Sequence, residues 1–187
     1  ALLAYPLFYM ETRYTLHRAM EKSEETIKKV SEGFAKAFGR DSGGFIKTYK
    51  LKDADVVVIS MGSIVGTIKD LIDQLEEEGK KVGLLQICSY RPFPRREIYN
   101  SLKDKMNIVV VEKSISLGRG GILASDVRWS FPRAEKKDRN ISSFIAGLGG
   151  RNITKNDLRY MVEKVEKEPV ELEFLGLKKE LISEKDL

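Results

Sequence analysis

Hydrophobic positions along the chain follow two different periods, and the change falls near residue 45. Over residues 14–38 the apolar side chains recur at the spacing of one helical face, and the opposite face is charged. Gly39 stands where a helix often ends, and the stretch GRDSGG then breaks the pattern. The spacing predicts one long helix over 14–38, and its apolar stripe is formed by Leu16, Met20, Ile27, Phe34 and Phe38.

Beyond that helix, short apolar runs alternate with helical patterns. Residues 45–50 alternate in the manner of a short edge strand. Continuous apolar runs predict strands buried on both faces at 56–60, 82–88, 107–112 and 141–146. Helical patterns are predicted to begin near Ser63, Pro94, Ile122 and Thr154. Strands separated by helices imply right-handed crossovers, and therefore a three-layer α/β/α domain on a mostly parallel sheet.

The patterns divide the chain into three parts. Residues 1–44 form an apolar arm and a long linker helix, residues 45–168 form the α/β domain, and residues 169–187 form a charged tail. The arm has neither a charged start nor a small-residue cleavage site, which argues against a signal peptide. Because the chain opens on Ala1, the simplest interpretation is a piece of something longer, whose arm docks on the missing part.

Composition and charge narrow the classes of function. The 33 Lys and Arg residues against 28 Asp and Glu give a net charge of +5, but the two signs are interspersed, which disfavours a nucleic-acid binder. No apolar run approaches the roughly 20 residues of a membrane span. The single Cys88 can neither form an intrachain disulfide nor ligate an iron–sulfur cluster alone, and we expect it to be buried. The single His17 is expected on the surface, and the cytoplasm is the expected compartment.

Two glycine turns are the candidate binding sites. Gly62 and Ser63 follow the first buried strand, and Gly66 completes G-x-x-x-G, which is neither a dinucleotide fingerprint nor a Walker loop. A helix N-terminus at this point can bind phosphate. Alternatively, Gly62 only permits a tight turn, Ser63 caps the helix, and Gly66 lets the helix approach the sheet.

The second turn is glycine-rich and carries an arginine. Gly118, Arg119, Gly120 and Gly121 can form an anion nest with an adjacent guanidinium, or a flexible strand-to-helix loop. The stretch 149–151 has the same ambiguity. None of these turns supplies a general base, a nucleophile or a metal cluster, so no catalytic residue is predicted.

The order of several motifs resembles one known family. A strand ending in SMGS, a strand leading into SYRPFP, and a strand ending in VVVEKSIS come first, followed by LGRGGIL and AGLGGRNIT. Together with the lead-in helix, this order resembles the transketolase C-terminal-like domain of the α subunit of pyruvate:ferredoxin oxidoreductases and their 2-oxoacid relatives. The resemblance covers about Thr12 to Val165.

The resemblance implies a non-catalytic assembly domain of a thiamine-dependent enzyme that oxidatively decarboxylates a 2-oxo acid to acyl-coenzyme A and reduces ferredoxin. Thiamine diphosphate, coenzyme A and iron–sulfur clusters would belong to the whole enzyme. The expected partners are the other domain of the α subunit and subunits of the β, γ and δ types, in a hetero-oligomer without nucleic acid or membrane.

The implied fold is a five-stranded sheet in the order 1-3-2-4-5 with an antiparallel first strand. That order would place Gly62 and Ser63 beside the loop Ser114 to Gly121 at the switch point. There they and Gly118, Arg119, Gly120 and Gly121 are a possible contact for an anion or coenzyme A. Two alternatives stay open. One is a free-standing module that binds coenzyme A or a nucleotide, and the other is a domain of a transketolase-like or 2-oxoacid dehydrogenase enzyme.

Overall fold

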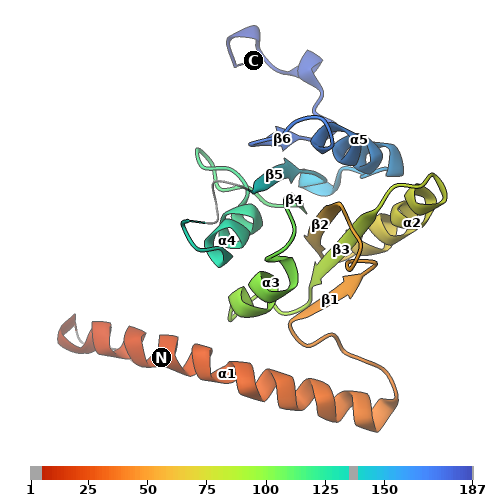
Figure 1. Cartoon of the computed structure of the whole chain (residues 1–187). Helices are drawn as coiled ribbons and strands as arrows, with labels where there is room; N and C mark the ends of the chain where they lie inside the picture. The colour runs from red at the N-terminus through yellow and green to blue at the C-terminus, as the bar shows by residue number, and fades with distance from the viewer. Residues whose placement is uncertain (1–5, 135–138, 187) are drawn as a thin grey trace. The chain divides into compact units, whose positions relative to one another are not determined.

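The chain forms two compact units. The computed structural model describes residues 6–134 and 139–186. One unit comprises the residues up to Lys47 together with Cys88–Pro94, and the other comprises Thr48–Ile87 and the residues from Arg95 onward. Figure 1 shows the elements of both. Among the described residues, no helix combines the length and the apolar character needed to cross a membrane.

The first unit is built on one long helix. A 3₁₀ turn, η1 (Pro6–Phe8), leads into α1 (Tyr9–Phe38), which begins at Tyr9 rather than at the predicted residue 14. Gly39 ends the helix as predicted, because it adopts a left-handed conformation with φ of 65° and its N–H donates to the carbonyl of Ala35 at 2.9 Å. Residues 1–5 of the predicted arm lie outside the described residues.

The apolar stripe of α1 changes in exposure along the helix. Ile27 and Phe34 are half-buried, whereas Leu16 and Met20 remain 52% and 44% exposed. The C-terminal half is held to the following loop by a hydrogen bond of 2.7 Å between the hydroxyls of Ser31 and Ser42. The first unit therefore covers only part of the stripe.

The second unit is built on a six-stranded sheet in the order β1-β3-β2-β4-β5-β6. The pairs β2–β3, β2–β4, β4–β5 and β5–β6 are parallel, and the edge pair β1–β3 is antiparallel. The predicted order of five strands is confirmed, and β6 extends the sheet by one. The strands are β1 (Ile46–Tyr49), β2 (Val56–Met61), β3 (Val82–Ile87), β4 (Asn107–Glu112), β5 (Asn140–Ile145) and β6 (Glu173–Phe174).

Helices cover both faces of this sheet, as the alternation of strands and helices predicts (Figure 1). Two helices, α2 (Ile64–Glu77) and α5 (Lys155–Val165), bury their apolar residues on one face, where they share a core with Val56 and Val58 of β2. The other two helices, α3 (Arg95–Leu102) and α4 (Ile122–Ser130), pack together on the opposite face.

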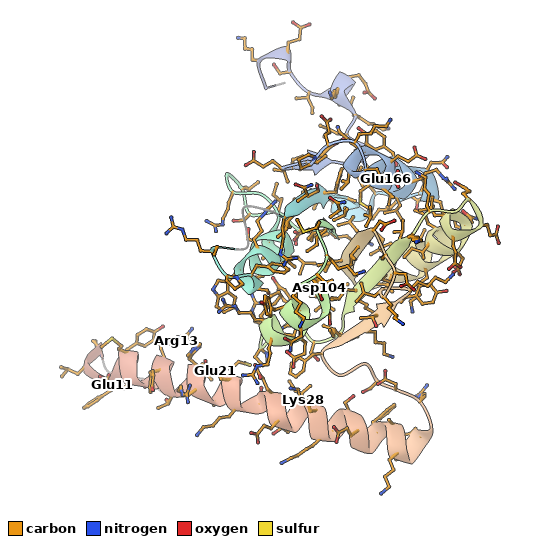
Figure 2. All side chains as sticks on the ribbon, viewed as in Figure 1. Glu11, Arg13, Glu21, Lys28, Asp104 and Glu166 are labelled. Atoms are coloured by element: carbon orange, nitrogen blue, oxygen red, sulfur yellow. The ribbon has the colours of Figure 1, made fainter. Side chains whose placement is uncertain are left out.

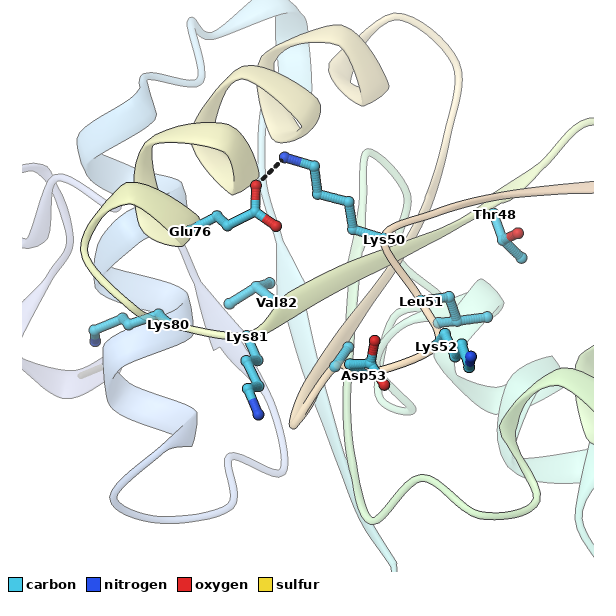
Figure 3. A pocket seen from close by; sticks show the side chains of 10 residues that line it. Thr48, Lys50, Leu51, Lys52, Asp53, Glu76, Lys80, Lys81 and Val82 are labelled. Carbon is cyan, nitrogen blue, oxygen red and sulfur yellow. Dashed lines mark hydrogen bonds and ion pairs between the residues drawn. The ribbon is translucent and has the colours of Figure 1, made fainter.

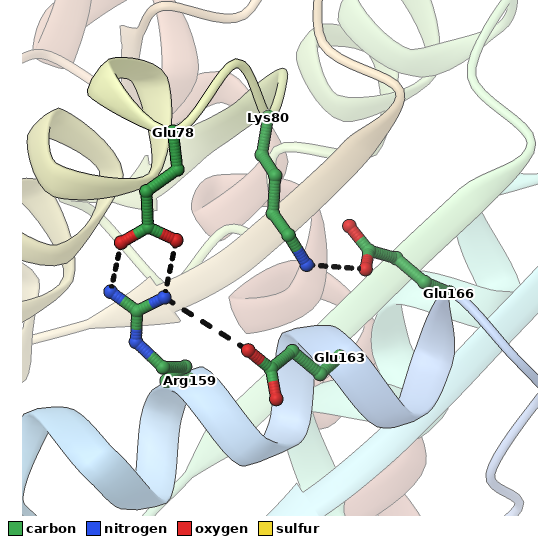
Figure 4. A network of polar contacts seen from close by, with 5 residues as sticks. All are labelled: Glu78, Lys80, Arg159, Glu163 and Glu166. Atoms are coloured by element: carbon green, nitrogen blue, oxygen red, sulfur yellow. Dashed lines mark hydrogen bonds and ion pairs between the residues drawn. The ribbon is translucent and has the colours of Figure 1, made fainter.

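Helix α5 is positioned by polar contacts at both ends. Its N-terminus carries the predicted capping box, in which the hydroxyl of Thr154 accepts from the N–H of Asp157 and the carboxylate accepts from Thr154. Farther along the helix, Arg159 forms a bidentate pair with Glu78 at 2.6 and 2.7 Å, and Lys80 lies 2.7 Å from Glu166 (Figure 4). Since the side chains of these pairs are partly exposed to solvent, the pairs orient the helix more than they stabilise it.

Part of the predicted tail belongs to the core of the second unit. Val170 and Leu175 are buried with exposures of 9% and 8%, and the N–H of Val170 donates to the buried hydroxyl of Ser142 at 2.9 Å. Beyond β6, the short turns η3 (Lys179–Leu181) and η4 (Glu184–Asp186) contain no buried residue among those described. The prediction of a tail from residue 169 missed this segment because two buried residues give no periodic signal.

The predictions for Cys88 and His17 have different outcomes. Cys88 is exposed rather than buried, because β3 ends at Ile87 and the N–H of Cys88 donates to the carbonyl of Phe45 at 2.8 Å. Phe131, the C-cap residue of α4, is 1% exposed and its ring contacts Tyr99. His17 is exposed as predicted.

Candidate functional site

The sheet order brings the two candidate turns to neighbouring strand ends. Strands β2 and β4 pair in parallel, with Ile59 opposite Val110, so both strands end at the same edge of the sheet. Gly62 follows β2, and the loop of residues 113–121 follows β4. Because β3 lies on the other side of β2, the strand order reverses at this point, which is where α/β folds commonly bind ligands.

The turn after β2 differs in detail from its prediction. Gly62 has φ of 78°, which explains the glycine, since L side chains rarely adopt this conformation. Ser63 does not cap α2: its φ and ψ of −66° and −27° are already helical, whereas a capping side chain needs an extended backbone. Gly66 does not bring the helix close to the sheet either, because a Cβ built there meets nothing within 4 Å.

The loop after β4 uses its own backbone donors. The N–H groups of Arg119 and Gly120 both donate to the carbonyl of Ser116 at 2.9 Å, and Gly120 in turn accepts from the N–H of Ser116 at 2.8 Å. Gly118 and Gly120 permit this tight turn with φ of 75° and 109°. Lys113 and the tip, Leu117 to Arg119, are exposed. Two of the four amides of the predicted anion nest, those of Arg119 and Gly120, already have partners.

A buried carboxylate occupies the start of α4. Glu112, the last residue of β4, is 3% exposed. Its carboxylate accepts from the N–H of Leu123 at 2.8 Å, from the N–H of Ala124 at 3.0 Å and from the hydroxyl of Ser114 at 2.7 Å. The N-cap residue of α4 is Gly121, which has no side chain for this purpose. Glu112 therefore takes the place that an external anion would occupy at this helix terminus.

Gly121 is required for this arrangement. A Cβ built on it would lie 2.2 Å from an oxygen of Glu112 and 2.8 Å from the hydroxyl of Ser143. The helix can approach the carboxylate only because no side chain intervenes. On the same helix, partial burial lowers the pKa of Arg128, and the carboxylates of Glu171 and Glu112 oppose that shift.

The structure thus separates the predicted site residues into two groups. Gly62, Ser63, Gly118 and Arg119 are exposed at the switch-point edge, whereas Gly120 and Gly121 are buried. Sequence reasoning missed Glu112. The available signal was an acidic residue that ends an apolar strand and precedes a helix without a capping side chain.

Several other charged residues have structural partners. A hollow of about 410 Å³ next to β1 contains four lysines (Figure 3), but Lys50 is bound by Asp73 and Glu76, and Lys80 by Glu166. Arg151, in the third glycine turn, donates to the carbonyl of Gly176 at 2.6 Å. Among the residues that the structure describes, no three His, Cys, Asp or Glu side chains come together as a metal site.

The fold and the switch-point edge of the sheet define the class of protein. It is an α/β domain in which the chain's own polar groups hold the glycine-rich loop after β4. Residues 54–158, more than half of the chain, match the family of pyruvate:ferredoxin oxidoreductase core domain II, and the chain belongs to that family. The predicted family is therefore confirmed.

The named relatives are longer than this chain. It is 43% identical to the pyruvate synthase subunit PorA of Methanocaldococcus jannaschii, with 87% of this chain and 41% of that subunit covered. It is 39% identical to PorA of Pyrococcus furiosus, with 96% of this chain and 46% of that subunit covered. For the ketoisovalerate oxidoreductase subunit VorA of Pyrococcus horikoshii the corresponding values are 35%, 88% and 42%. The chain spans less than half the length of each of these relatives.

Proposed function

We propose that this chain is a non-catalytic assembly domain, the C-terminal part of an α-type subunit, in a 2-oxoacid:ferredoxin oxidoreductase. The enzyme would oxidatively decarboxylate a 2-oxo acid, with pyruvate as the first candidate, to acyl-coenzyme A and pass the electrons to ferredoxin. The names of the relatives support this class of reaction, and they include both a pyruvate and a ketoisovalerate enzyme.

The observation that carries the assembly role is the exposure of α1. No residue of this 30-residue helix is buried, although it has an apolar stripe. Tyr9, Leu16 and Met20, which we name the α1 apolar face, are 56%, 52% and 44% exposed. Charged side chains such as Glu21 and Lys28 (Figure 2) lie on other faces of the helix. An apolar stripe of this length is typical of a helix that packs against another protein segment.

The proposed occupant of the α1 apolar face is the segment of the subunit that the relatives carry outside the match. That segment accounts for more than half of their length, so it is large enough to form a domain of its own. Arg13 lies beside this face, between Tyr9 and Leu16 on the helix, but the three named residues are apolar, so the face fits an apolar groove rather than a charged one.

The cofactors of the enzyme belong, in this proposal, to other parts of the assembly. Thiamine diphosphate would bind to the missing segment and its partner subunit, and iron–sulfur clusters to other subunits, because the single Cys88 does not supply a set of cluster ligands. Subunits of the β, γ and δ types and ferredoxin complete the proposed hetero-oligomer. A cytoplasmic location is part of the same proposal.

A contact with coenzyme A is a narrower proposal at the switch-point edge. The groups available there are the exposed turn at Gly62 and Ser63 and the guanidinium of Arg119, since Glu112 occupies the start of α4. The hydroxyl of Ser63 is available for a ligand, because it makes no capping hydrogen bond to α2. A thermal shift of the assembled enzyme with coenzyme A, reduced in the variant Arg119→Ala, would support this contact.

The experiment that tests the assembly role uses a divided subunit. The segment of M. jannaschii PorA outside the match is produced as a separate polypeptide with the other subunits of its enzyme, and the present chain is added with an affinity tag. We expect the chain to co-elute with them as one complex. The double variant Leu16→Asp and Met20→Asp should lose this association, because two charges would be buried in an apolar interface.

Lys22→Asp is the matched control, since Lys22 is exposed on α1 away from the apolar face. It should co-elute as the unchanged chain does. A complex that forms equally well with the double variant would show that the α1 apolar face is not the contact. A chain that does not associate at all would contradict the proposed function.

A further inference from the structure

The second unit has an exposed aromatic side chain that its own fold does not use. Trp129, the only tryptophan of the chain, lies near the end of α4 and is 54% exposed. The guanidinium of Arg95 on α3 lies over its ring at 4.6 Å from the ring centre. Two turns earlier on the same face of α4, Ile122 is 39% exposed. The core between these helices is formed by other residues, namely Ile98, Leu102, Val127 and Phe131.

We propose that this surface, defined by Arg95, Ile122 and Trp129 and named the α3–α4 surface, is a second docking site of the chain. Tryptophan and arginine are the residues most enriched among those that dominate protein interfaces. A stacked guanidinium keeps its outer edge available for two parallel hydrogen bonds to a carboxylate. The pair is held by α3 and α4 rather than by a loop, so it is already ordered before a partner arrives.

The charge around the pair indicates the chemistry of the partner. Arg96 and Arg133 are exposed and make no hydrogen bond or ion pair with the described residues, so their charge faces outward. Arg128 differs, because its guanidinium turns inward and donates to the carbonyl of Ile141 at 2.7 Å. Asp126 lies on the same face of α4, between Ile122 and Trp129, and is already engaged in an interaction within the chain. The three arginines around the aromatic and aliphatic centre, Arg95, Arg96 and Arg133, outnumber this carboxylate, and they complement an acidic protein segment that presents an apolar side chain between carboxylates.

The occupant to which we commit is such an acidic segment on another subunit of the oxidoreductase. This proposal rests on the proposed function, because that function supplies the partner. It is separate from the α1 apolar face, since the two surfaces belong to different units of the chain and have different chemistry. The α1 apolar face is complementary to an apolar groove, whereas the α3–α4 surface is complementary to carboxylates.

The single tryptophan permits a direct test. The chain is labelled with 5-fluorotryptophan, so that its only fluorine signal reports on Trp129, and it is mixed with the unlabelled remainder of M. jannaschii pyruvate synthase. In the free chain the signal should show the solvent isotope shift between H₂O and D₂O that marks an exposed ring. In the complex the signal should move and lose that isotope shift.

Variants define the role of charge. Arg95→Glu should weaken the complex roughly thirtyfold, as expected for a central interface residue, and Arg96→Glu on the next position of α3 should weaken it only a fewfold. Equal losses in both variants would indicate a general effect of charge and would overturn the assignment to Arg95. Leu117→Ala, at an exposed apolar residue on a different loop, should leave the affinity unchanged.

Each remaining outcome is distinct. A complex that forms while the fluorine signal keeps its isotope shift would overturn the α3–α4 surface and leave the proposed function standing. A signal already shielded in the free chain would show that the chain itself covers Trp129, which also overturns the proposal. Failure of any complex to form would overturn the proposed function, and this inference with it.

Discussion

Replacing Glu112 by glutamine isolates the charge that holds the start of α4. The carboxylate accepts two backbone N–H groups through buried bonds and one hydroxyl through a part-buried bond. An amide of the same size keeps one acceptor oxygen but points an NH₂ group at one of the two N–H donors. One buried donor then loses its partner, at a cost of about 1–3 kcal/mol. The lost negative charge at the helix N-terminus adds about 0.3–1 kcal/mol.

The expected loss for Glu112→Gln is therefore about 3 kcal/mol in the free energy of unfolding. Urea unfolding followed by the fluorescence of Trp129 measures it, because Trp129 lies on the helix in question. With a urea dependence of about 2 kcal/mol per molar, the midpoint should fall by roughly 1.5 M.

Two comparisons test the reasoning behind this value. Ser114→Ala removes only one of the three bonds and should cost about 1 kcal/mol. Glu168→Gln changes the same functional group at an exposed position and should stay within about 0.5 kcal/mol. A free energy of unfolding for Glu112→Gln within about 0.5 kcal/mol of that of the unchanged chain would refute this role of the carboxylate.

Four further variants test local features of the structure. Ser63→Ala should change the free energy of unfolding by less than about 0.5 kcal/mol, because its side chain makes no cap bond; a loss near 1 kcal/mol would restore the cap. Gly66→Ala should raise that free energy by up to about 1 kcal/mol, since the added methyl meets nothing within 4 Å; a lower unfolding temperature would contradict this. Thr154→Ala should cost about 1 kcal/mol through the lost capping box, measured by urea unfolding, and no loss would exclude the box as a source of stability. Hydrogen bonds from Lys50 and Tyr49 lower the pKa of Asp73, so its contribution to stability is present above the ordinary value near 4 and is lost as the pH falls below it; Asp73→Asn should flatten the stability curve in that acid range, and an unchanged acid slope would contradict the assignment.

The fold was largely predictable because its signals are local and repeated. The continuous apolar run of β4 (Asn107–Glu112) predicted a strand with the observed bounds, and the capping box at Thr154 predicted the start of α5. The alternation of residues 45–50 predicted the edge strand, whereas its antiparallel orientation and the order of the sheet came from resemblance to a family, since pairing between distant segments leaves no periodic signal in one sequence.

The details of the candidate site were less predictable for physical reasons. Ser63 has the right residue type for a cap, but capping depends on backbone angles that the residue type does not determine. Glu112 caps α4 from the end of β4, and a loop separates the two elements. No short-range spacing in the sequence therefore connects Glu112 to Leu123. Cys88 lies one position beyond the end of β3, and a sequence pattern locates the end of a strand only to within one or two residues. The burial of Cys88 was therefore predicted wrongly.

The central claim is that this chain completes a 2-oxoacid:ferredoxin oxidoreductase without carrying its catalytic groups. The most direct test measures pyruvate- and coenzyme A-dependent reduction of an electron acceptor by three preparations: the chain alone, the remainder of M. jannaschii pyruvate synthase alone, and the two together. The account predicts turnover only when the two are combined. Turnover by the chain alone, or a remainder that is as active without the chain as with it, would contradict the claim.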